Sequence, residues 1–254
     1  MDMAKMTETF RKKLATGVLG IFSKTSDPAF VEAAGYAGLD FIVIDLEHGP
    51  VTIQTAQNLI RAAQVAEIFP IIRAKEGESS VLGEALDIGA GALQIPQITT
   101  AAEARAVIDR VKFWPEGNRG VCRFVRAAAY SATDRFEYFE NANKSLVILQ
   151  IEGELGIDNI DEILEVPGID IIFVGPYDLS QSLGLAGQVG HIKVEEKMLE
   201  IVKKCKERGI TTGTFADTPE NAAKWKKNGV KYLSYSVDVG IFYDAVKNLV
   251  KTIK

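Results

Sequence analysis

The segment AAGYAGLDFIVID (residues 33–45) carries an amphipathic stretch, a glycine and an uninterrupted apolar run, in that order. The same order recurs in ALDIGAGALQIP (85–96) and in KKNGVKYLSYS (226–236). The runs FIVID (41–45) and IDIIFVG (169–175) show little polar alternation, which is expected where both faces of a parallel strand are covered. Repeated units of helix, glycine and buried strand therefore predict a parallel α/β architecture.

Along the rest of the chain, apolar runs of this kind alternate with longer amphipathic segments. The expected strands cover residues 18–23, 41–45, 70–73, 92–96, 146–152, 169–175, 211–215 and 232–236. Capping signals begin several helices, such as Asp27 before Pro28 and Thr100 followed by Glu103. This strict alternation predicts a (β/α)8 TIM barrel, formed as a single domain by residues 1–254. The alternative, a doubly wound sheet, usually has fewer strands and a glycine-rich first turn, and no GxGxxG occurs here.

The composition narrows the class of protein. The 254 residues carry a net charge of −5 and are 47% hydrophobic, as in soluble globular proteins. This charge gives no support for nucleic-acid binding, which needs a basic face. We expect no membrane segment, because no run approaches ~18 apolar residues and the first residues lack the apolar core of a signal peptide. Cys122 and Cys205 have no disulfide or metal spacing, so we expect a cytoplasmic protein.

Polar and ionisable residues gather at the ends of the expected strands. In a (β/α)8 barrel the catalytic residues lie at the carboxyl ends of the strands, so these positions are candidates for one site. They are Asp45, Glu47 and His48 after the second strand, Arg73 at the third, Gln97 at the fourth, Gln150 and Glu152 at the fifth, Asp178 after the sixth, and Phe215 with Asp217 at the seventh.

Glu152 and Asp178 are candidate metal ligands, since they follow neighbouring strands. Two carboxylates, together with water and substrate oxygens, suit Mg²⁺ or Mn²⁺, because Mg²⁺ keeps several waters in most protein sites. The alternative is that each carboxylate caps the helix that follows it, a common role at helix N-termini.

His48 and Arg73 are candidates for proton transfer and anion binding. Asp45, three residues before His48, could orient the imidazole and raise its basicity, as a general base requires; a hydrogen-bonded loop histidine is the alternative. Arg73 ends an apolar run, where a guanidinium needs an anionic partner. That partner is a substrate carboxylate or enolate oxygen, or else Glu47 or Glu152.

A covalent amine mechanism and phosphate binding are weaker hypotheses. Lys24 and Lys75 lie near strand ends but outside the apolar runs, where burial would lower the pKa of an amine. The loops after the last two strands lack the paired glycines of a phosphate turn. The stretch 113–145 is too long for a bare loop, and we expect it to form part of the active-site cover.

Several motifs together resemble a known family. They are FIVIDLEHGP (41–50), PIIRAK (70–75), GALQIPQ (91–97), GNRGVCR (117–123), LQIEGELG (149–156) and DIIFVGPYDLSQSLG (170–184). In this combination the chain is similar, over nearly its whole length, to the metal-dependent class II pyruvate aldolases. That family is typified by 4-hydroxy-2-oxoheptanedioate aldolase and 2-dehydro-3-deoxyglucarate aldolase.

The resemblance implies a role for each strand-end residue. His48, oriented by Asp45, serves as the base together with a metal-bound water. Arg73 holds the pyruvyl oxygen and stabilises the enolate. Glu152 and Asp178 ligate the divalent metal, which is Mg²⁺, Mn²⁺ or Co²⁺.

The resemblance also implies a substrate wall and an assembly. The residues of this wall are Arg73, Gln150, Gly175, Pro176, Tyr177 and Phe215. The family is typically hexameric, so we expect a homo-oligomer in which the last helix is exchanged between neighbouring barrels.

Two departures from the family pattern concern the aldehyde pocket. Tyr177 stands where the family usually has a small residue. The stretch 122–131, with Phe124 and Arg126, replaces a glycine-rich segment. We expect both changes to lie beside the aldehyde, so the pyruvate half keeps the family pattern while the identity of the aldehyde stays open.

The leading hypothesis is an aldolase that cleaves a 4-hydroxy-2-oxo acid to pyruvate and an aldehyde, or runs the reverse. One alternative is a citrate-lyase-like barrel lyase acting on a CoA thioester. It should have a basic groove, whereas the sequence offers only scattered Arg119, Arg123 and Arg126. The other alternative is a non-catalytic barrel that binds oxo acids, which needs Arg73 but not His48. The sequence leaves open the aldehyde, the preferred metal and the physiological direction.

Overall fold

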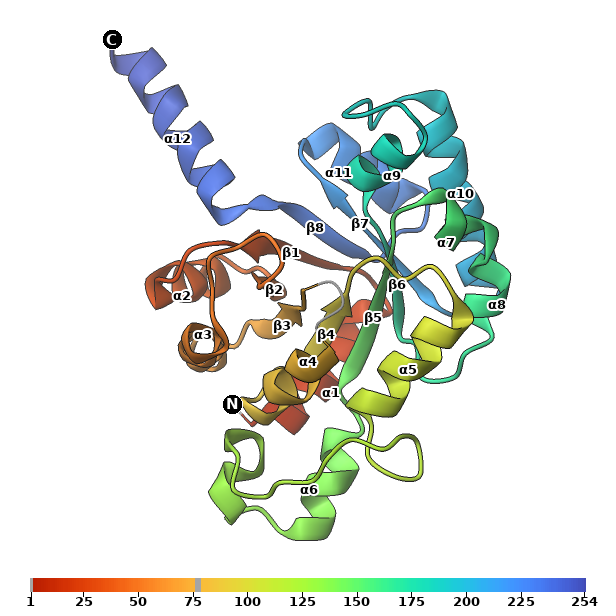
Figure 1. Ribbon diagram of the computed structural model, residues 1–254. Coiled ribbons are helices and arrows are strands. Elements are labelled where there is room, and N and C mark those ends of the chain that lie inside the picture. The colour runs from red at the N-terminus through yellow and green to blue at the C-terminus, as the bar shows by residue number, and fades with distance from the viewer. Residues whose placement is uncertain (1, 76–78) are drawn as a thin grey trace.

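The computed structural model describes residues 2–75 and 79–254. Its parallel strands close into a barrel in the order of the chain, from β1 to β8, with β8 paired to β1 (Figure 1). The strands are β1 (Val18–Ser23), β2 (Phe41–Asp45), β3 (Phe69–Arg73), β4 (Ala92–Ile95), β5 (Leu146–Ile151), β6 (Ile171–Val174), β7 (Thr211–Ala216) and β8 (Tyr232–Val237). The predicted (β/α)8 barrel is therefore confirmed, and every strand end lies within two residues of its expected position.

Helices surround the barrel (Figure 1). They are α1 (Met3–Leu14), α2 (Pro28–Tyr36), α3 (Ile53–Val65), α4 (Ser79–Asp87), α5 (Ala101–Val111), the 3-10 helix η1 (Arg126–Ser131), α6 (Arg135–Ala142), α7 (Glu154–Asp158), α8 (Ile160–Leu164), α9 (Pro176–Ser182), α10 (Ile192–Glu207), α11 (Pro219–Lys227) and α12 (Asp238–Ile253). The expected caps are present. Asp27 Oδ1 accepts the amide N–H of Ala29 at 2.9 Å, and Thr100 and Glu103 form a reciprocal capping box.

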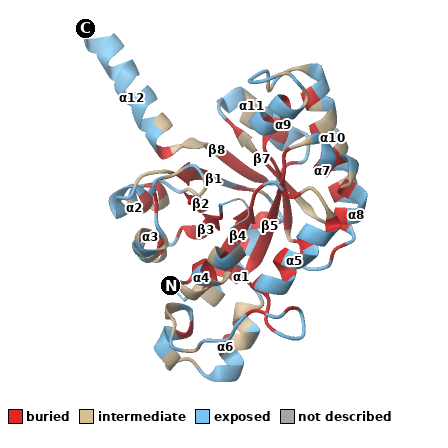
Figure 2. Cartoon of the chain, viewed as in Figure 1, coloured by how far each residue is buried: buried red, intermediate tan, exposed pale blue. Residues whose placement is uncertain are grey.

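Most strand residues are buried, as Figure 2 shows, although the end of β8 is only partly covered. One set of side chains fills the barrel interior and includes Phe22, Val43 and Phe173. The other set packs against the surrounding helices and includes Ile42 and Ile172. This two-sided burial explains why the strand sequences lack polar alternation.

Helix α1 closes the amino-terminal end of the barrel. The ring of Phe10 stacks on Phe69, with ring centroids 4.2 Å apart, and meets the edge of Phe41 at 6.0 Å. Met6 and Leu14 are buried in the same interior cluster. Apolar side chains therefore fill the interior of the barrel at this end.

The stretch 113–145 does not cover the site, contrary to our expectation. Its η1 and α6 lie beside α1, where the Arg11 guanidinium donates to the carbonyl of Lys144 at 2.9 Å. Arg126 donates to the carbonyl of Ile88 at 2.9 Å in the same region, so it is not beside an aldehyde pocket in this chain. The stretch follows helix α5, which ends at the amino-terminal side of the barrel. Residues 113–145 therefore pack on that side.

Helix α12 extends away from the barrel (Figure 1), and most of its length is exposed (Figure 2). Its exposed side chains include the apolar Ile241, Phe242, Val246 and Leu249. Exchange of this helix between subunits stays a prediction. Among the described residues, no helix is long and apolar enough to span a membrane.

The aromatic contacts of α1 predict that Phe10→Ala destabilises the barrel. Removing a fully buried phenylalanine leaves a cavity, so the free energy of unfolding should fall by about 3–5 kcal/mol. Urea unfolding measures this change. The matched control is Phe136→Ala in α6, whose side chain is exposed and should change stability by about 0.5 kcal/mol or less. Equal small effects of both substitutions would contradict a core role for α1.

Candidate active site

The predicted site residues meet around one cavity of about 360 Å³ at the carboxyl ends of the strands. The cavity is lined by His48, Arg73, Gln150, Gly175, Pro176, Tyr177, Asp178 and Phe215, all of which the sequence singled out. Asp45 and Glu152, which are buried, contact this wall through Arg73 and Gln150.

A buried ion pair between Asp45 and Arg73 forms one side of the site. The two residues are directly paired in the register of β2 and β3. The guanidinium donates from Nε to Oδ1 at 2.9 Å and from Nη2 to Oδ2 at 2.8 Å. Burial acts to raise the pKa of Asp45, but the hydrogen bonds and charge of Arg73 outweigh it and hold this pKa below its ordinary value. The same pairing overcomes the opposing effect of burial on Arg73 and raises its pKa, so both groups stay ionised.

Glu47 also contacts the guanidinium of Arg73. Its Oε2 lies 2.9 Å from Arg73 Nη1, yet this buried oxygen has no partner with hydrogen-bond geometry among the described residues. Burial raises the pKa of Glu47, and the charge of Arg73 partly opposes that rise. Glu47, which the sequence analysis named as an alternative partner of Arg73, therefore contacts it. The guanidinium thus has a structural role whether or not it also binds a substrate.

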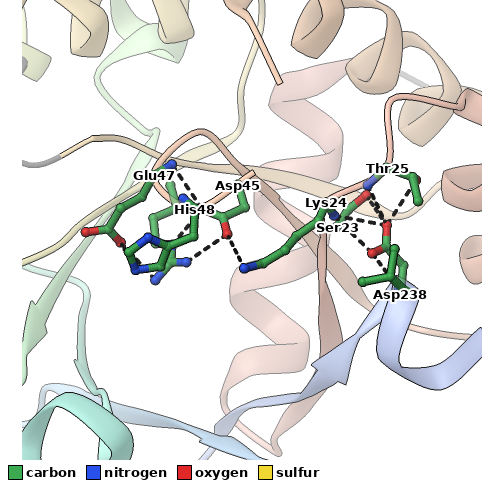
Figure 3. A network of polar contacts seen from close by, with 9 residues as sticks. Ser23, Lys24, Thr25, Asp45, Glu47, His48 and Asp238 are labelled. Carbon is green, nitrogen blue, oxygen red and sulfur yellow. Dashed lines mark hydrogen bonds and ion pairs between the residues drawn. The ribbon is translucent and has the colours of Figure 1, made fainter. Parts of the chain in front are cut away.

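His48 is held differently from our expectation. Asp45 Oδ1 accepts the backbone N–H of His48 at 3.2 Å, and among the described residues its carboxylate forms no hydrogen bond with the imidazole. The imidazole instead lies beside Glu47, whose Oε2 is 3.8 Å from His48 Nε2 (Figure 3). The imidazole side chain is 61% exposed at the mouth of the cavity. Asp45 thus positions the backbone of His48, because Arg73 already occupies its carboxylate.

A chain of buried hydrogen bonds leads through the barrel to Glu152. The Tyr232 hydroxyl donates to Gln94 Oε1 at 3.1 Å, and Gln94 Nε2 donates to Gln150 Oε1 at 2.7 Å. Gln150 Nε2 then donates to Glu152 Oε2, while Glu152 Oε1 accepts the backbone N–H of Gln97 at 3.0 Å. Every donor in this chain points toward the carboxylate, so its orientation is fixed from inside the barrel.

Glu152 does not cap helix α7 (Glu154–Asp158), because the N-cap residue of this helix is Gly153 and no side chain caps it. Burial raises its pKa to about 7; the hydrogen bond from Gln150 opposes this rise and the negative charge of Asp178 adds to it. Gly175 is required beside it, because a Cβ atom there would overlap with Glu152 Oε2. The site therefore holds a buried carboxylate close to a second negative charge.

This donor set fits a divalent cation. Oxygen ligands suit Mg²⁺ and Mn²⁺, and a cation between Glu152 and Asp178 would offset the repulsion that raises the pKa of Glu152. No cluster of three or more histidine, cysteine or acidic side chains with metal-binding geometry occurs in the described part of the chain. Water and substrate oxygens would therefore complete the shell, as Mg²⁺ allows.

Tyr177 borders the cavity beside Phe215, with ring centroids 6.1 Å apart. Its hydroxyl donates to Asp217 Oδ2 at 2.5 Å, and this hydrogen bond raises the pKa of Tyr177 to about 12. The phenol is thus a neutral donor that is already engaged. The departure at Tyr177 lies at the site, unlike the departure at Arg126.

Sequence reasoning missed three parts of this arrangement. Gln94 and Tyr232 lie within strands, where their polar groups were hidden among apolar neighbours. Asp238, whose carboxylate accepts the backbone N–H of Lys24 at 3.0 Å (Figure 3), follows β8 directly, and this place just past a strand was the signal that could have identified it. Lys24 was considered only as a nucleophile, although it lines the cavity.

The barrel brings acidic groups, an arginine and a histidine together at the carboxyl ends of its strands, where the active sites of (β/α)8 enzymes lie. The family model of the HpcH/HpaI aldolase/citrate lyase family matches residues 18–245, and the chain belongs to this family. It is an enzyme of the aldolase type, a carbon–carbon lyase.

Individual relatives agree with this assignment. The chain is 35% identical to a 2-keto-3-deoxy-L-rhamnonate aldolase of Escherichia coli O17:K52:H18, over 96% of this chain and 92% of that protein. A family protein from Burkholderia cenocepacia J2315 is 31% identical, with a TM-score of 0.89 and coverage of 93% and 94%. The citrate synthase SbnG is 29% identical, with a TM-score of 0.87 and coverage of 97% and 96%.

The raised pKa of Glu152 predicts a pH dependence of stability in metal-free protein. The folded state keeps the proton up to about pH 7, whereas the unfolded chain loses it near the ordinary value of 4.5. The stabilisation of the folded state by the protonated Glu152 is therefore fully present below pH 4.5 and is lost as the pH rises to about 7. A shift of one pKa unit corresponds to about 1.4 kcal/mol. Between pH 4.5 and pH 8 the free energy of unfolding of Glu152→Gln should therefore rise by about 3 kcal/mol relative to that of the parent.

Urea unfolding of both proteins in EDTA measures this difference. Glu154→Gln, an exposed glutamate in α7, is the matched control and should follow the parent at every pH. If Glu152→Gln also follows the parent, Glu152 does not titrate in this way.

Proposed function

We propose that this enzyme is a divalent-metal-dependent aldolase that cleaves a 4-hydroxy-2-oxo acid to pyruvate and an aldehyde, or runs the reverse. The observation that carries the proposal is the pairing of a buried carboxylate, Glu152, with Asp178 across the cavity wall from the ionised Arg73. The similarity to 2-keto-3-deoxy-L-rhamnonate aldolases supports a keto-deoxy acid as substrate.

Glu152 and Asp178 would hold the cation, which is Mg²⁺, Mn²⁺ or Co²⁺. When bound, the cation supplies Lewis-acid chemistry at the carboxylate and carbonyl of the 2-oxo acid. Gln150 fixes the direction of the Glu152 carboxylate, and Gly175 leaves room for it. These residues hold the pyruvate half of the substrate at the inner wall of the cavity.

Arg73 and His48 would carry the reaction. His48, exposed at the mouth, accepts the proton of the C4 hydroxyl as the C3–C4 bond breaks. The electron pair moves onto the pyruvate enolate, and Arg73 donates to the oxygen on which the negative charge grows. Arg73 can do this throughout the cycle, because its paired carboxylates keep it charged and in place. Pro176, Tyr177 and Phe215 form the wall against which the substrate packs.

The CoA-thioester alternative receives less support. Arg119 is paired with Asp87 at 2.6 Å, and the Arg123 guanidinium donates to the carbonyl of Thr133 at 3.0 Å. None of Arg119, Arg123 and Arg126 lines the cavity described above. These arginines do not form the basic groove that the phosphates of CoA require. Their arrangement therefore favours an aldolase that forms a small aldehyde over a lyase that acts on a CoA thioester.

A homo-oligomer is part of the proposal. An apolar helix that stands away from its own barrel needs a partner surface, because large exposed apolar patches are rare in isolated soluble proteins. We place α12 on a neighbouring barrel in a hexamer of a cytoplasmic enzyme. Residues 1–254 form a single domain in this proposal, and we expect no nucleic-acid or membrane partner.

Exchange of the C3 protons of pyruvate with solvent tests the enolate and the metal together. We expect exchange in the presence of Mg²⁺, followed by proton NMR, and its loss in EDTA. Glu152→Gln and Asp178→Asn should each weaken Mn²⁺ binding about tenfold or more while remaining folded. Full exchange in EDTA, or borohydride trapping of pyruvate on a lysine, would rule out the metal-dependent mechanism.

His48→Ala should lower the rate of aldol cleavage by about 10²–10⁴, the usual contribution of a general base. The affinity for pyruvate should change little, because the imidazole lies at the mouth and the pyruvate half is held deeper in the cavity. Steady-state kinetics and a pyruvate titration separate the two effects. His191→Ala, at the N-cap of α10, is the control. An unchanged cleavage rate would show that His48 is not the base.

A further inference from the structure

A second cavity lies at the amino-terminal end of the barrel, opposite the proposed active site. Its volume is about 480 Å³, and α1, η1, α6 and the end of α4 enclose it. In Figure 1 this region lies where α6 approaches α1. Gly89, Ala90 and Gly91, which precede β4, and Ser145, which precedes β5, also line the cavity. A cavity of this size can hold a small organic molecule.

Three buried polar groups in the wall of this cavity lack a hydrogen-bond partner. They are Nε of Arg119 and the hydroxyls of Tyr138 and Ser145, none of which has a partner among residues 2–75 and 79–254. These residues are only 7%, 3% and 8% exposed. A buried polar group that stays unpaired costs about 1–3 kcal/mol. Because all three groups can donate, the partner that would satisfy them is an oxygen acceptor.

Arg119 and Tyr138 are held together on the ring of Phe113. The guanidinium carbon of Arg119 lies 4.6 Å from the centroid of this ring, and the ring of Tyr138 meets it edge-on at 5.9 Å. Arg119 Nη2 donates to Asp87 Oδ1 at 2.6 Å. Burial raises the pKa of Tyr138, so its hydroxyl keeps the proton that it can donate. Because Asp87 compensates the charge of Arg119, this part of the cavity suits an uncharged oxygen.

Arg126 brings an uncompensated positive charge to the same cavity. The half-buried guanidinium donates from Nη1 to the carbonyl of Ile88 at 2.9 Å and from Nη2 to Gln64, and both of these acceptors are neutral. In the part of the chain that the structure describes, no carboxylate pairs with it, and burial and the charge of Arg61 lower its pKa. Gly89, at φ +98°, leaves room for the guanidinium, because a Cβ atom there would come within 2.6 Å of Nη1. This part of the cavity therefore suits an anion.

Carboxylates at the edge of the cavity limit the charge of an occupant. Asp2, Asp134 and Glu137 line the cavity and are exposed. Asp134 already caps α6, since its Oδ1 accepts the backbone N–H of Phe136 at 2.9 Å. A second negative charge on the ligand would be repelled by these groups. A ligand with one carboxylate therefore fits better than one with two.

We propose that this cavity binds a small monocarboxylic acid that carries an uncharged oxygen at its other end. The carboxylate binds the Arg126 guanidinium, and the uncharged oxygen accepts from Arg119, Tyr138 and Ser145. The ligand lies at the opposite end of the barrel from Glu152, so it cannot take part in the reaction at the active site. The inference does not depend on the proposed function.

Hydroxy acids and their matched analogues test both ends of this site. The probes are 4-hydroxybutanoate and 6-hydroxyhexanoate, their amides, and the unsubstituted butanoate and hexanoate, titrated calorimetrically in EDTA so that no metal holds a carboxylate. For at least one chain length, the parent should bind the hydroxy acid about 10–100-fold more tightly than its amide, the effect of a charge-assisted hydrogen bond. It should bind the hydroxy acid about 2–10-fold more tightly than the unsubstituted acid, the effect of a neutral hydrogen bond.

Two variants assign the two ends separately. Arg126→Gln should reduce the preference for the acid over the amide to about one. Tyr138→Phe should weaken the preference for the hydroxyl about threefold while keeping the preference for the charge, and it tests the site even if Arg126→Gln fails to fold. Arg61→Gln, which removes an exposed arginine of α3, is the matched control and should leave both ratios within about twofold of the parent.

Hydrogen–deuterium exchange locates the bound ligand. A saturating hydroxy acid should slow the exchange of backbone amides in residues 126–145 and leave the loops after β2 and β6 unchanged. Slower exchange in those loops instead would place the ligand at the active site. Equal affinities for acid and amide would show that the cavity holds only water, and protection of residues 126–145 that follows protein concentration would show that a second copy covers it. Each of these three results overturns the inference and leaves the aldolase proposal unaffected.

Discussion

The ion pair between Asp45 and Arg73 is the interaction on which the rest of the site depends. It forms because the register of β2 and β3 places the two residues side by side at the rim of the barrel. Asp45 compensates the buried guanidinium and, through its remaining lone pairs, fixes the turn that carries Glu47 and His48. A buried charge without its partner is strongly destabilising, so neither residue can change alone. Local folding and the chemistry of the site are therefore set by the same contact.

Polar side chains inside a barrel core are costly unless they are fully hydrogen-bonded, and this enzyme uses them to orient one carboxylate. Gln94 and Gln150 each donate toward Glu152, and Tyr232 begins the chain. The arrangement gives Glu152 a single direction in spite of its burial. The site thus has two halves: a charge-balanced wall at Arg73, and an acidic wall whose excess negative charge suits a cation.

The sequence was sufficient for the fold and for most of the site, because strand ends in a parallel barrel converge whatever the intervening helices contain. FIVID and IDIIFVG could be recognised as buried strands, and the residues after them were recognised as neighbours. The partner of His48 could not be predicted, since Arg73 competes for the same carboxylate only once the strands are in register. The stretch 113–145 was misplaced because sequence separation does not tell at which end of a barrel a long connection packs.

The aromatic stack of Phe10 on Phe69 fills the amino-terminal end of the barrel, so the substrates of the proposed aldolase would enter and leave at the carboxyl ends of the strands. Whatever enters first occupies the deep end, and whatever lies near the rim departs first. In the proposed reaction, with Glu152 buried and His48 exposed at the mouth of the cavity, the oxo-acid fragment would be the last to leave. The packing of α1 at the closed end of the barrel, far from any reacting atom, would thereby set the order in which the two products leave the cavity.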